Sequence, residues 1–480
     1  MQLDDYTGHD AVGLAALIRA GEVTAAEVAA VAREAIARAD EVVHGLAYPV
    51  FAEPLAYDPG GPLAGVPFLI KDVPMARGVP FSVGSQAVPD VRAAHDSDLM
   101  ARFRAAGLAT FGSTSMCELG LSFATEPVRT GPVRNPFDPA RGAGGSSGGA
   151  AALVAAGAVP VAHANDGAGS IRVPASCCGL VGLKPSRGRV PCGPDTGEGA
   201  FGLAYEFALT RTVRDAAHLL DAVHGPAAGD KYTAPPPRRP YRAELTADPG
   251  RLRVALSTRA WSGAPVDPQV AAATRRAGLL LERLGHLVEP GSPAVDWEDV
   301  LAGVRGQLVA NAAPLLMAPR PPDPAKLEAV TRRVLEEVRA ASAMDLVRAF
   351  AAHNRVSRAV GRFLRTVDVL VTPTLARPPA PHGTLDYDND AHTVDGWLRK
   401  LFDYGPFTAV FNISGQPAVS LPLGRTDDGL PIGVQLVAGY GREDLLIALA
   451  AALEPEFITN STGFIGKSPR NIDGRTDAVI

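Results

Sequence analysis

Hydrophobic and polar positions along this chain follow helical and strand periods that delimit several elements. Residues 24–39 carry apolar residues at helical intervals, behind Thr24 and Glu27 at the spacing of a capping box. Residues 61–75 contain a short apolar run bounded by prolines, which indicates a buried strand. Residues 97–107 show the cap and glycine stop of a further helix, and the strand pattern "LATFGST" follows.

The alternation of strand and helix continues through the rest of the chain. The stretch "GGAAALVAAGA" predicts a helix of small residues, and "VPVAHA" predicts the strand after it. Residues 297–366 have a mainly helical pattern, and residues 367–375 return to a strand pattern. Two more strands, "QPAVSLPLG" and "PIGVQLVAG", precede a last helix in "REDLLIALAAALE". The chain therefore predicts an α/β fold whose sheet is at least partly parallel or mixed.

Composition and charge narrow the class of protein. The 480 residues are 46% hydrophobic and 20% charged, which is typical of a globular protein with a substantial core. The net charge is −5 and no basic run occurs, so we expect neither a nucleic-acid nor a membrane partner. The start, "MQLDDYTGHD", lacks the features of a secretory signal, and no stretch offers 18 uncharged apolar residues. We predict a cytoplasmic protein.

Four cysteines are too few for a disulfide scaffold and lack the paired spacing of a zinc site. We predict that Cys117, Cys177, Cys178 and Cys192 are buried thiols and that the protein holds no metal.

Two glycine-rich clusters, "RGAGGSSGGA" and "NDGAGS", each enclose a serine, Ser146 and Ser170. Such clusters are typical of sites that need positive φ angles or close backbone approach. A phosphate-binding loop is excluded because no lysine follows the glycines. Ser146 does satisfy G-x-S-x-G, the nucleophile elbow of α/β-hydrolases, but prolines rather than a strand precede it. That reading would need His382 or His392 as its base.

Ser170 follows a predicted strand, in a position suited to acyl transfer. The successive backbone N–H groups of Gly167, Ala168, Gly169 and Ser170 can form a nest that binds an oxyanion. A serine hydroxyl needs a base before it can attack. His163 is nearest in sequence, but a histidine within a strand more often belongs to the core.

Lys71 is a second candidate base. The chain has 40 arginines and only six lysines, and Lys71 ends an apolar run. Arginine does not lose its proton, whereas burial lowers the pKa of a lysine and makes the neutral amine accessible. The alternative is a lysine at a strand end that extends to solvent, which the local sequence favours slightly.

Four segments together resemble the amidase signature family. They are "GVPFLIKDV", "GGSSGGAAALVAAGAVPVAHANDGAGSIRVPASCCGLVGLKPSRGRV", "FNISGQPAVSLPLG" and "LPIGVQLVAG", and the similarity runs from about residue 10 to residue 454. The resemblance implies an amidase signature fold, a large mixed twisted sheet covered by helices on both faces. It also implies one amidase domain over 1–455, with an N-terminal helical segment (about 1–60), a catalytic core (about 61–225) and a helical insertion (about 297–366). Residues 456–480 differ in composition, and we predict an atypical tail that is either vector-derived or a divergent native segment.

The resemblance assigns the catalytic residues as well. It implies that Ser170 attacks the carbonyl, Ser146 relays the proton and neutral Lys71 is the base, with a cis peptide bond between Gly145 and Ser146. The backbone N–H groups of residues 167–170 would form the oxyanion hole. Supporting roles fall to Gly145, Ser147, Asp166 and Arg172. The family usually has glycine where this chain has Ala168, which is tolerable only with a negative φ.

The family resemblance also implies the kind of substrate. The sequence of these segments is similar to that of the bacterial branch that contains nylon-oligomer hydrolases, aryl acylamidases and urethanases. We therefore expect the substrate to be a small amide, anilide or carbamate, with hydrolysis of esters as a side activity. No cofactor is implied, and we expect a monomer or homodimer. The alternative within the family is an A-subunit of glutamyl-tRNA amidotransferase, which releases ammonia from glutamine. We expect residues 117–122, 190–206 and 300–350 to line the pocket, and residues 317–326 to cap it as a mobile loop.

Overall fold

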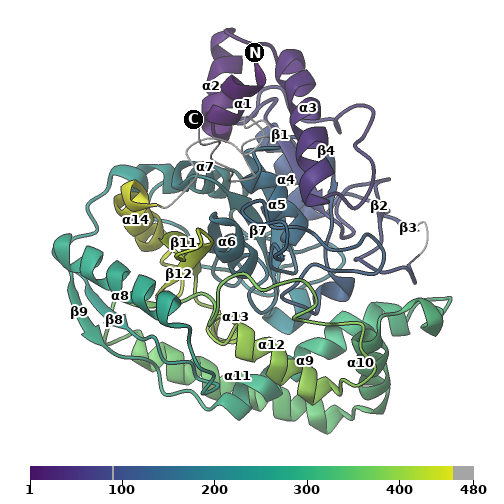
Figure 1. The fold of residues 1–480 in the computed structure, drawn as a ribbon, viewed down its shortest axis with the longest axis vertical. Helices are drawn as coiled ribbons and strands as arrows, with labels where there is room; N and C mark the ends of the chain where they lie inside the picture. Colours follow the sequence, from purple (N-terminus) through teal and green to yellow (C-terminus); the bar gives the residue numbers. More distant parts are fainter. Residues whose placement is uncertain (89–90, 458–480) are drawn as a thin grey trace, which may run out of the picture.

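A mixed sheet of ten strands runs through the molecule in the computed structural model, which describes residues 1–88 and 91–457 (Figure 1). Its strands are β1 (Pro67–Lys71), β4 (Ala109–Thr114), β5 (Val161–Asp166), β6 (Val181–Lys184), β7 (Tyr205–Thr210), β8 (Arg253–Leu256), β9 (Leu287–Pro290), β10 (Val369–Pro373), β11 (Ala418–Arg425) and β12 (Pro431–Ala438). They lie in the order β4-β1-β5-β7-β6-β11-β12-β10-β8-β9. A separate two-stranded sheet pairs β2 (Pro80–Phe81) with β3 (Val91–Arg92).

The sheet is parallel at its two ends and antiparallel in its middle. Strand β1 pairs in parallel with both β4 and β5, and β8 pairs in parallel with both β10 and β9. The pairs from β5 through β7, β6, β11 and β12 to β10 are all antiparallel. The predicted α/β class with a mixed sheet is confirmed.

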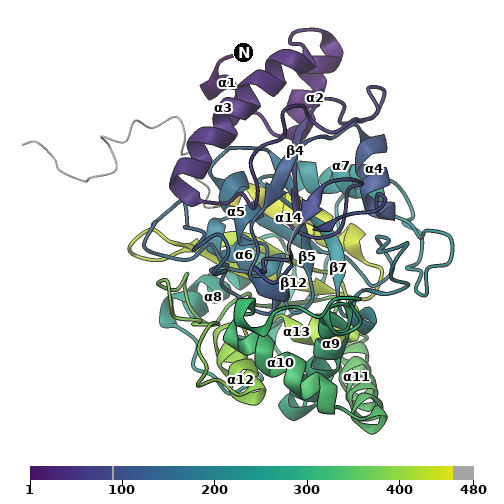
Figure 2. The ribbon, with the colours of Figure 1, turned by 90° about the vertical axis from the view of Figure 1, so that its right-hand side faces the viewer.

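Helices cover both faces of the sheet. The described helices are α1 (Leu3–Gly8), α2 (Ala11–Ala20), α3 (Ala25–Val43), α4 (Asp98–Ala106), α5 (Gly148–Ala155), α6 (Arg172–Cys178), α7 (Val213–Val223), α8 (Pro268–Arg283), α9 (Trp297–Leu316), α10 (Ala329–Ala340), α11 (Ala343–Phe363), α12 (Val394–Tyr404), α13 (Ala409–Ser414) and α14 (Glu443–Leu453). Helices α5, α6 and α8 lie on one side, and α4, α7 and α14 lie on the other (Figure 2). None of the helices in this part of the chain is long and apolar enough to cross a membrane.

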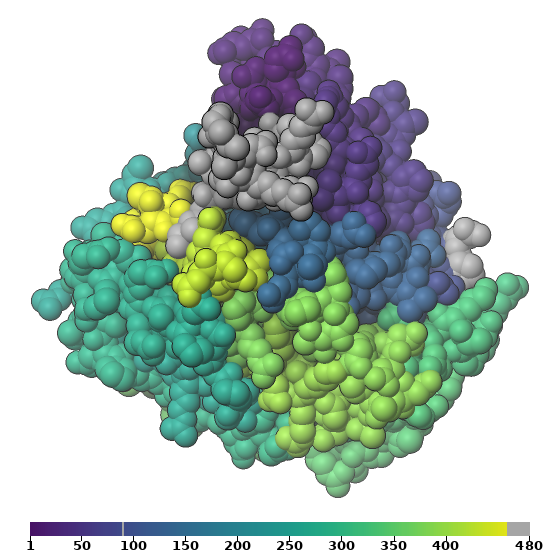
Figure 3. Space-filling view, viewed as in Figure 1, coloured from purple at the N-terminus to yellow at the C-terminus, as the bar shows by residue number. Residues whose placement is uncertain are grey.

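Two helical groups extend beyond the sheet at opposite ends of the molecule. The N-terminal helices α1, α2 and α3 form one end, and α9, α10, α11 and α12 form the other (Figure 1). The space-filling view shows the same separation on this face, with the first residues of the chain far from its helical second half (Figure 3). Apart from its first two residues, the predicted tail over 456–480 lies outside the described residues.

Local sequence signals explain several element boundaries. Thr24 caps α3, and its reciprocal hydrogen bonds with Glu27 form the predicted capping box. Ser97 caps α4, which ends at Gly107 in the left-handed conformation with φ 92°. Strand β1 is buried at every position, as its apolar run predicts. These three predictions are confirmed.

Candidate active site

Lys71 is the last residue of β1 and is fully buried. Its Nζ lies 2.7 Å from Ser146 Oγ, 2.8 Å from Ser147 Oγ and 2.7 Å from Asn165 Oδ1. Parallel neighbours flank β1 on both sides, so its end points into the protein. The alternative of a lysine that extends to solvent is therefore wrong.

The pKa of Lys71 is lowered to about 8, because burial disfavours the ammonium form. Nearby acidic groups, such as Glu206 and Asp166, oppose this shift only in part. An ammonium group would donate to all three of its neighbours. The neutral amine has two N–H groups and a lone pair, so a serine hydroxyl can donate to it.

Ser146 lies in the loop that leads into α5, and the peptide bond between Gly145 and Ser146 is cis, as the resemblance implies. A Cβ atom on Gly145 would come within 2.8 Å of the Ser122 carbonyl oxygen, which explains the glycine. No strand leads directly into this serine in the described chain. The two late histidines contact other groups: His382 contacts Glu126 and Pro139, and His392 contacts Asp386. The α/β-hydrolase alternative is therefore wrong.

Ser170 belongs to a tight loop between β5 and α6. Gly169 has a φ of 149°, and a Cβ atom on it would lie 2.5 Å from Thr408 Oγ1. That hydroxyl donates to the Ala168 carbonyl at 2.5 Å, and Ala168 is not among the residues with positive φ. The alanine in place of the usual glycine thus fits the loop. In the described part of the chain, the backbone N–H groups of residues 167–170 donate to no other group.

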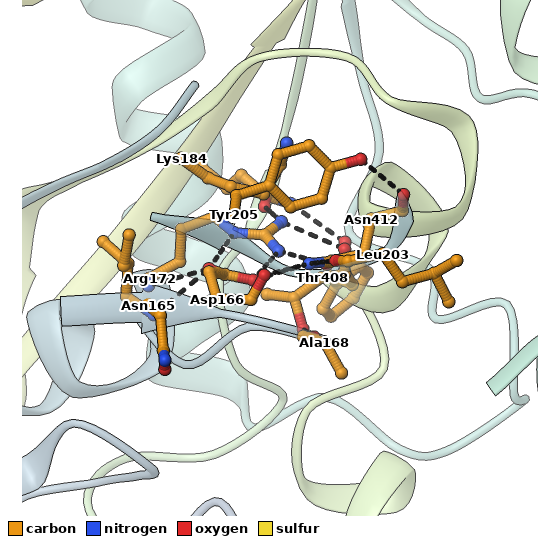
Figure 4. Close-up of polar contacts among 12 residues, drawn as sticks. Asn165, Asp166, Ala168, Arg172, Lys184, Leu203, Tyr205, Thr408 and Asn412 are labelled. Carbon is orange, nitrogen blue, oxygen red and sulfur yellow. Dashed lines mark hydrogen bonds and ion pairs between the residues drawn. The ribbon is translucent and has the colours of Figure 1, made fainter. Parts of the chain in front are cut away.

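A buried ion pair holds both ends of this loop (Figure 4). Arg172 donates from Nε to Asp166 Oδ2 at 2.9 Å and from Nη2 to Asp166 Oδ1 at 2.8 Å, and both residues are fully buried. Asp166 Oδ2 also accepts from the backbone N–H of Ile171. Burial alone would raise the pKa of Asp166, but Arg172 and Asn412 lower it to about 2. Gln435 accepts from Arg172 Nη1 at 2.7 Å, so the loop is anchored to β12.

The structure brings Lys71 into contact with Ser146 and places Ser170 on a cavity wall nearby. Within the described residues, no hydrogen bond joins the hydroxyls of Ser146 and Ser170. Ser147 completes the group, since its hydroxyl contacts Lys71 and donates to the Asn165 carbonyl at 3.3 Å.

The cavity beside Ser170 has a volume of about 40 Å³ accessible to the centres of water-sized spheres. Its wall is mostly apolar and is formed by Gly120, Leu121, Ser122, Phe123, Gly167, Ala168, Ser170, Val304, Gln307, Leu308, Val334, Val394, Trp397, Leu398, Leu401 and Phe402. Segments 117–122 and 300–350 contribute as predicted. Residues 190–206 do not line it and instead help to form a separate hollow, so that prediction is wrong. No residue of 317–326 lines the cavity.

Sequence reasoning missed several residues of the site. Asn165 accepts a hydrogen bond from Lys71, and its only signal was a polar residue at the end of an apolar strand. Helix α12 contributes five lining residues that carried no signal. His163 is fully buried and contacts Glu206 Oε2 at 2.7 Å, which confirms it as a core histidine. It also accepts from the backbone N–H of Lys71 at 3.3 Å.

The four cysteines are free thiols that differ in how deeply they are buried. Cys117, Cys177 and Cys178 are buried free thiols as predicted, whereas Cys192 is partly exposed, which corrects the prediction for that residue. Within the described residues, no group of three or more His, Cys, Asp or Glu side chains could hold a metal ion.

Comparisons with known proteins show the family to which the chain belongs. Residues 14–447 match the amidase family model. The chain is 37% identical over 473 residues to the 6-aminohexanoate-cyclic-dimer hydrolase of Pseudomonas sp. (strain NK87), covering 93% of this chain and 94% of that one.

Solved structures show the same likeness. A 6-aminohexanoate cyclic dimer hydrolase in complex with substrate has a TM-score of 0.89 and 35% identity, covering 97% of this chain and 99% of that one. A bacterial aryl acylamidase of the amidase signature enzymes has a TM-score of 0.84 and 26% identity, covering 96% and 99%.

Fold and site together define an amidase, a hydrolase of the α/β fold class that acts on C–N bonds of amides. The chain belongs to the amidase signature family.

Proposed function

We propose that this amidase cleaves small amides, anilides and carbamates, with Ser170 as nucleophile, Ser146 as proton relay and Lys71 as base. The contact between the buried Lys71 amine and Ser146 Oγ, at 2.7 Å, carries the proposal. With a pKa of about 8, about a tenth of Lys71 is neutral at pH 7 and most of it is neutral at pH 9. A base with this pKa suits mildly alkaline conditions.

The reaction proceeds in two halves. Ser170 Oγ attacks the carbonyl carbon while its proton passes to Ser146, whose own proton passes to Lys71 Nζ. The free N–H groups of residues 167–170 stabilise the oxyanion of the tetrahedral intermediate. As the intermediate collapses, the C–N bond breaks and the leaving amine takes a proton back through Ser146. Water then attacks the acyl-enzyme with the same base, and the acid is released with Ser170 restored.

The cavity wall supports an aromatic or extended apolar substrate. Phe123, Trp397 and Phe402 contribute aromatic rings to it. The names of two relatives, a cyclic-dimer hydrolase and an aryl acylamidase, indicate amide substrates of that kind. A carbamate offers the same carbonyl to Ser170. Cleavage of its C–O bond releases the alcohol or phenol, which takes the proton back through Ser146, and leaves a carbamoyl-enzyme. An ester should also react, because an alkoxide leaves more easily than an amine.

The test is release of the chromophore from a matched p-nitroanilide and p-nitrophenyl carbamate. We expect Ser170→Ala to abolish turnover of both and Lys71→Ala to reduce it strongly. Ser176→Ala is the matched control, because this serine is equally buried in α6 but outside the cavity. Activity that survives Ser170→Ala would overturn the assignment. Ammonia release from glutamine, with neither chromogenic substrate cleaved, would favour the amidotransferase alternative.

A further inference from the structure

Gln307 is a polar residue on an otherwise apolar part of the cavity wall. It belongs to α9, is 7% exposed and lines the cavity together with Gly167 and Ser170. Its neighbours on the same helix, Val304 and Leu308, also line the cavity and are apolar. A leucine or methionine would fit such a wall without burying polar atoms.

The carboxamide of Gln307 lies beside Gly167, the first residue of the loop 167–170 whose N–H groups would form the oxyanion hole. A Cβ atom on Gly167 would clash with Gln307 Nε2, so the glycine makes room for this group. Gly167 also supplies the first of the four backbone N–H groups that have no acceptor in the described structure. The side-chain N–H₂ group therefore lies beside the loop that is suited to bind the substrate oxygen.

Gln307 has no structural partner that would explain it. Its Oε1 is enclosed and accepts no hydrogen bond, and no hydrogen bond from Nε2 occurs within the described residues. A glutamine that stabilised the fold would be paired at one end or both, since buried polar groups are normally hydrogen-bonded. Unlike other unpaired buried side chains, Gln307 lies on the cavity wall, so its carboxamide is available to a molecule bound there.

We propose that Gln307 is a further catalytic residue, whose Nε2 donates a hydrogen bond to the substrate carbonyl oxygen as it becomes an oxyanion. This inference rests on the proposed function, because it takes Ser170 as the nucleophile. A side-chain amide next to backbone N–H groups is a recurring form of oxyanion stabilisation. The contribution grows with the charge on the oxygen, so it lowers the barrier more than it strengthens substrate binding.

The variant Gln307→Met tests this role by removing the donor while keeping the length of the side chain. We expect kcat to fall about 10- to 100-fold on both the anilide and its ester, with KM changed by less than about threefold. Gln307→Glu, which keeps the shape but replaces the donor, should lose at least as much. Binding of benzeneboronic acid, which forms a tetrahedral adduct with a nucleophilic serine, should weaken by a similar factor in Gln307→Met.

The matched control is Gln416→Met. Gln416 is also buried with an unpaired Oε1, but it does not line the cavity, so its replacement should leave kcat unchanged. An unchanged kcat in Gln307→Met, a rise in KM alone, or a loss confined to the anilide would overturn the inference. Ser170→Ala is measured alongside: if it retains activity the proposed function fails, whereas if it is inactive and Gln307→Met is fully active, only the role of Gln307 fails.

Discussion

The charge on Lys71 should destabilise the folded protein, because folding removes that charge from water. An exposed lysine has a pKa of 10.5, and in the fold the pKa of Lys71 is about 8. Each unit of difference corresponds to about 1.36 kcal/mol, so the charged form lowers the free energy of unfolding by about 3 kcal/mol. Replacing Lys71 by methionine removes the charge and keeps an unbranched chain.

The effect has a defined pH window. Below pH 8 the lysine is charged in both the folded and the unfolded protein, so the full destabilisation is present. Between about pH 8 and 10.5 the folded protein releases the proton while the unfolded chain keeps it, and the destabilisation disappears as pH rises. The stability advantage of Lys71→Met should therefore be largest at neutral pH and decrease with increasing pH.

Urea denaturation at pH 7.5 and pH 9.5 measures this advantage. We expect Lys71→Met to be more stable than the wild type by about 3 kcal/mol at pH 7.5, and this difference to fall by about 2 kcal/mol at pH 9.5. The variant should be inactive. Lys184→Met is the control, since Lys184 is another fully buried lysine whose pKa burial lowers, and its replacement should stabilise the protein without abolishing activity. A Lys71→Met protein that is less stable at both pH values would refute the reasoning.

Three further outcomes follow from the site. We expect kcat/KM to rise about tenfold per pH unit below pH 8, as Lys71 loses its proton. Asn165→Asp should move this rising part of the pH profile to higher pH, because a carboxylate beside Lys71 favours the charged lysine; an unchanged pH profile would contradict the contact between Lys71 and Asn165. Gly169→Ala should lower kcat more than about 100-fold, since φ is 149° and the new Cβ would lie 2.5 Å from a threonine hydroxyl; near-normal turnover would count against the loop geometry. Arg172→Leu should lower the free energy of unfolding by about 3–5 kcal/mol, because Asp166 would stay buried without its ion pair; calorimetry that finds under about 1 kcal/mol would argue otherwise.

Element boundaries were predictable from the sequence where local chemistry sets them. The capping box at Thr24 and the serine cap at Ser97 each satisfy backbone groups within one turn, so the signal and its effect lie together in the chain. The burial of Lys71 was not predictable in this way. It depends on β4 and β5, which flank β1 in the sheet. In the sequence, the residues of these two strands lie 38 to 95 positions after Lys71.

The residues of the site were likewise predictable only where the local sequence marks them. Ser146 and Ser170 stand in glycine clusters that mark unusual backbone, and four motifs in order were enough to assign them by resemblance. Residues 190–206 follow Ser170 closely in sequence, yet they line a separate hollow beside Arg187 and Tyr232. Gln307 and the α12 residues reach the cavity only through helix packing at the far end of the molecule, which no local pattern encodes.

The loop that carries Ser170 is held from a distant part of the chain. Thr408 fixes the Ala168 carbonyl, while Asn412 and Gln435 contact the Asp166–Arg172 pair. A ribosome therefore completes about 90% of the described residues before any of these three contacts can form. The nascent enzyme should therefore stay inactive until its last strands leave the ribosome. It becomes able to hydrolyse a substrate only when the sheet is complete.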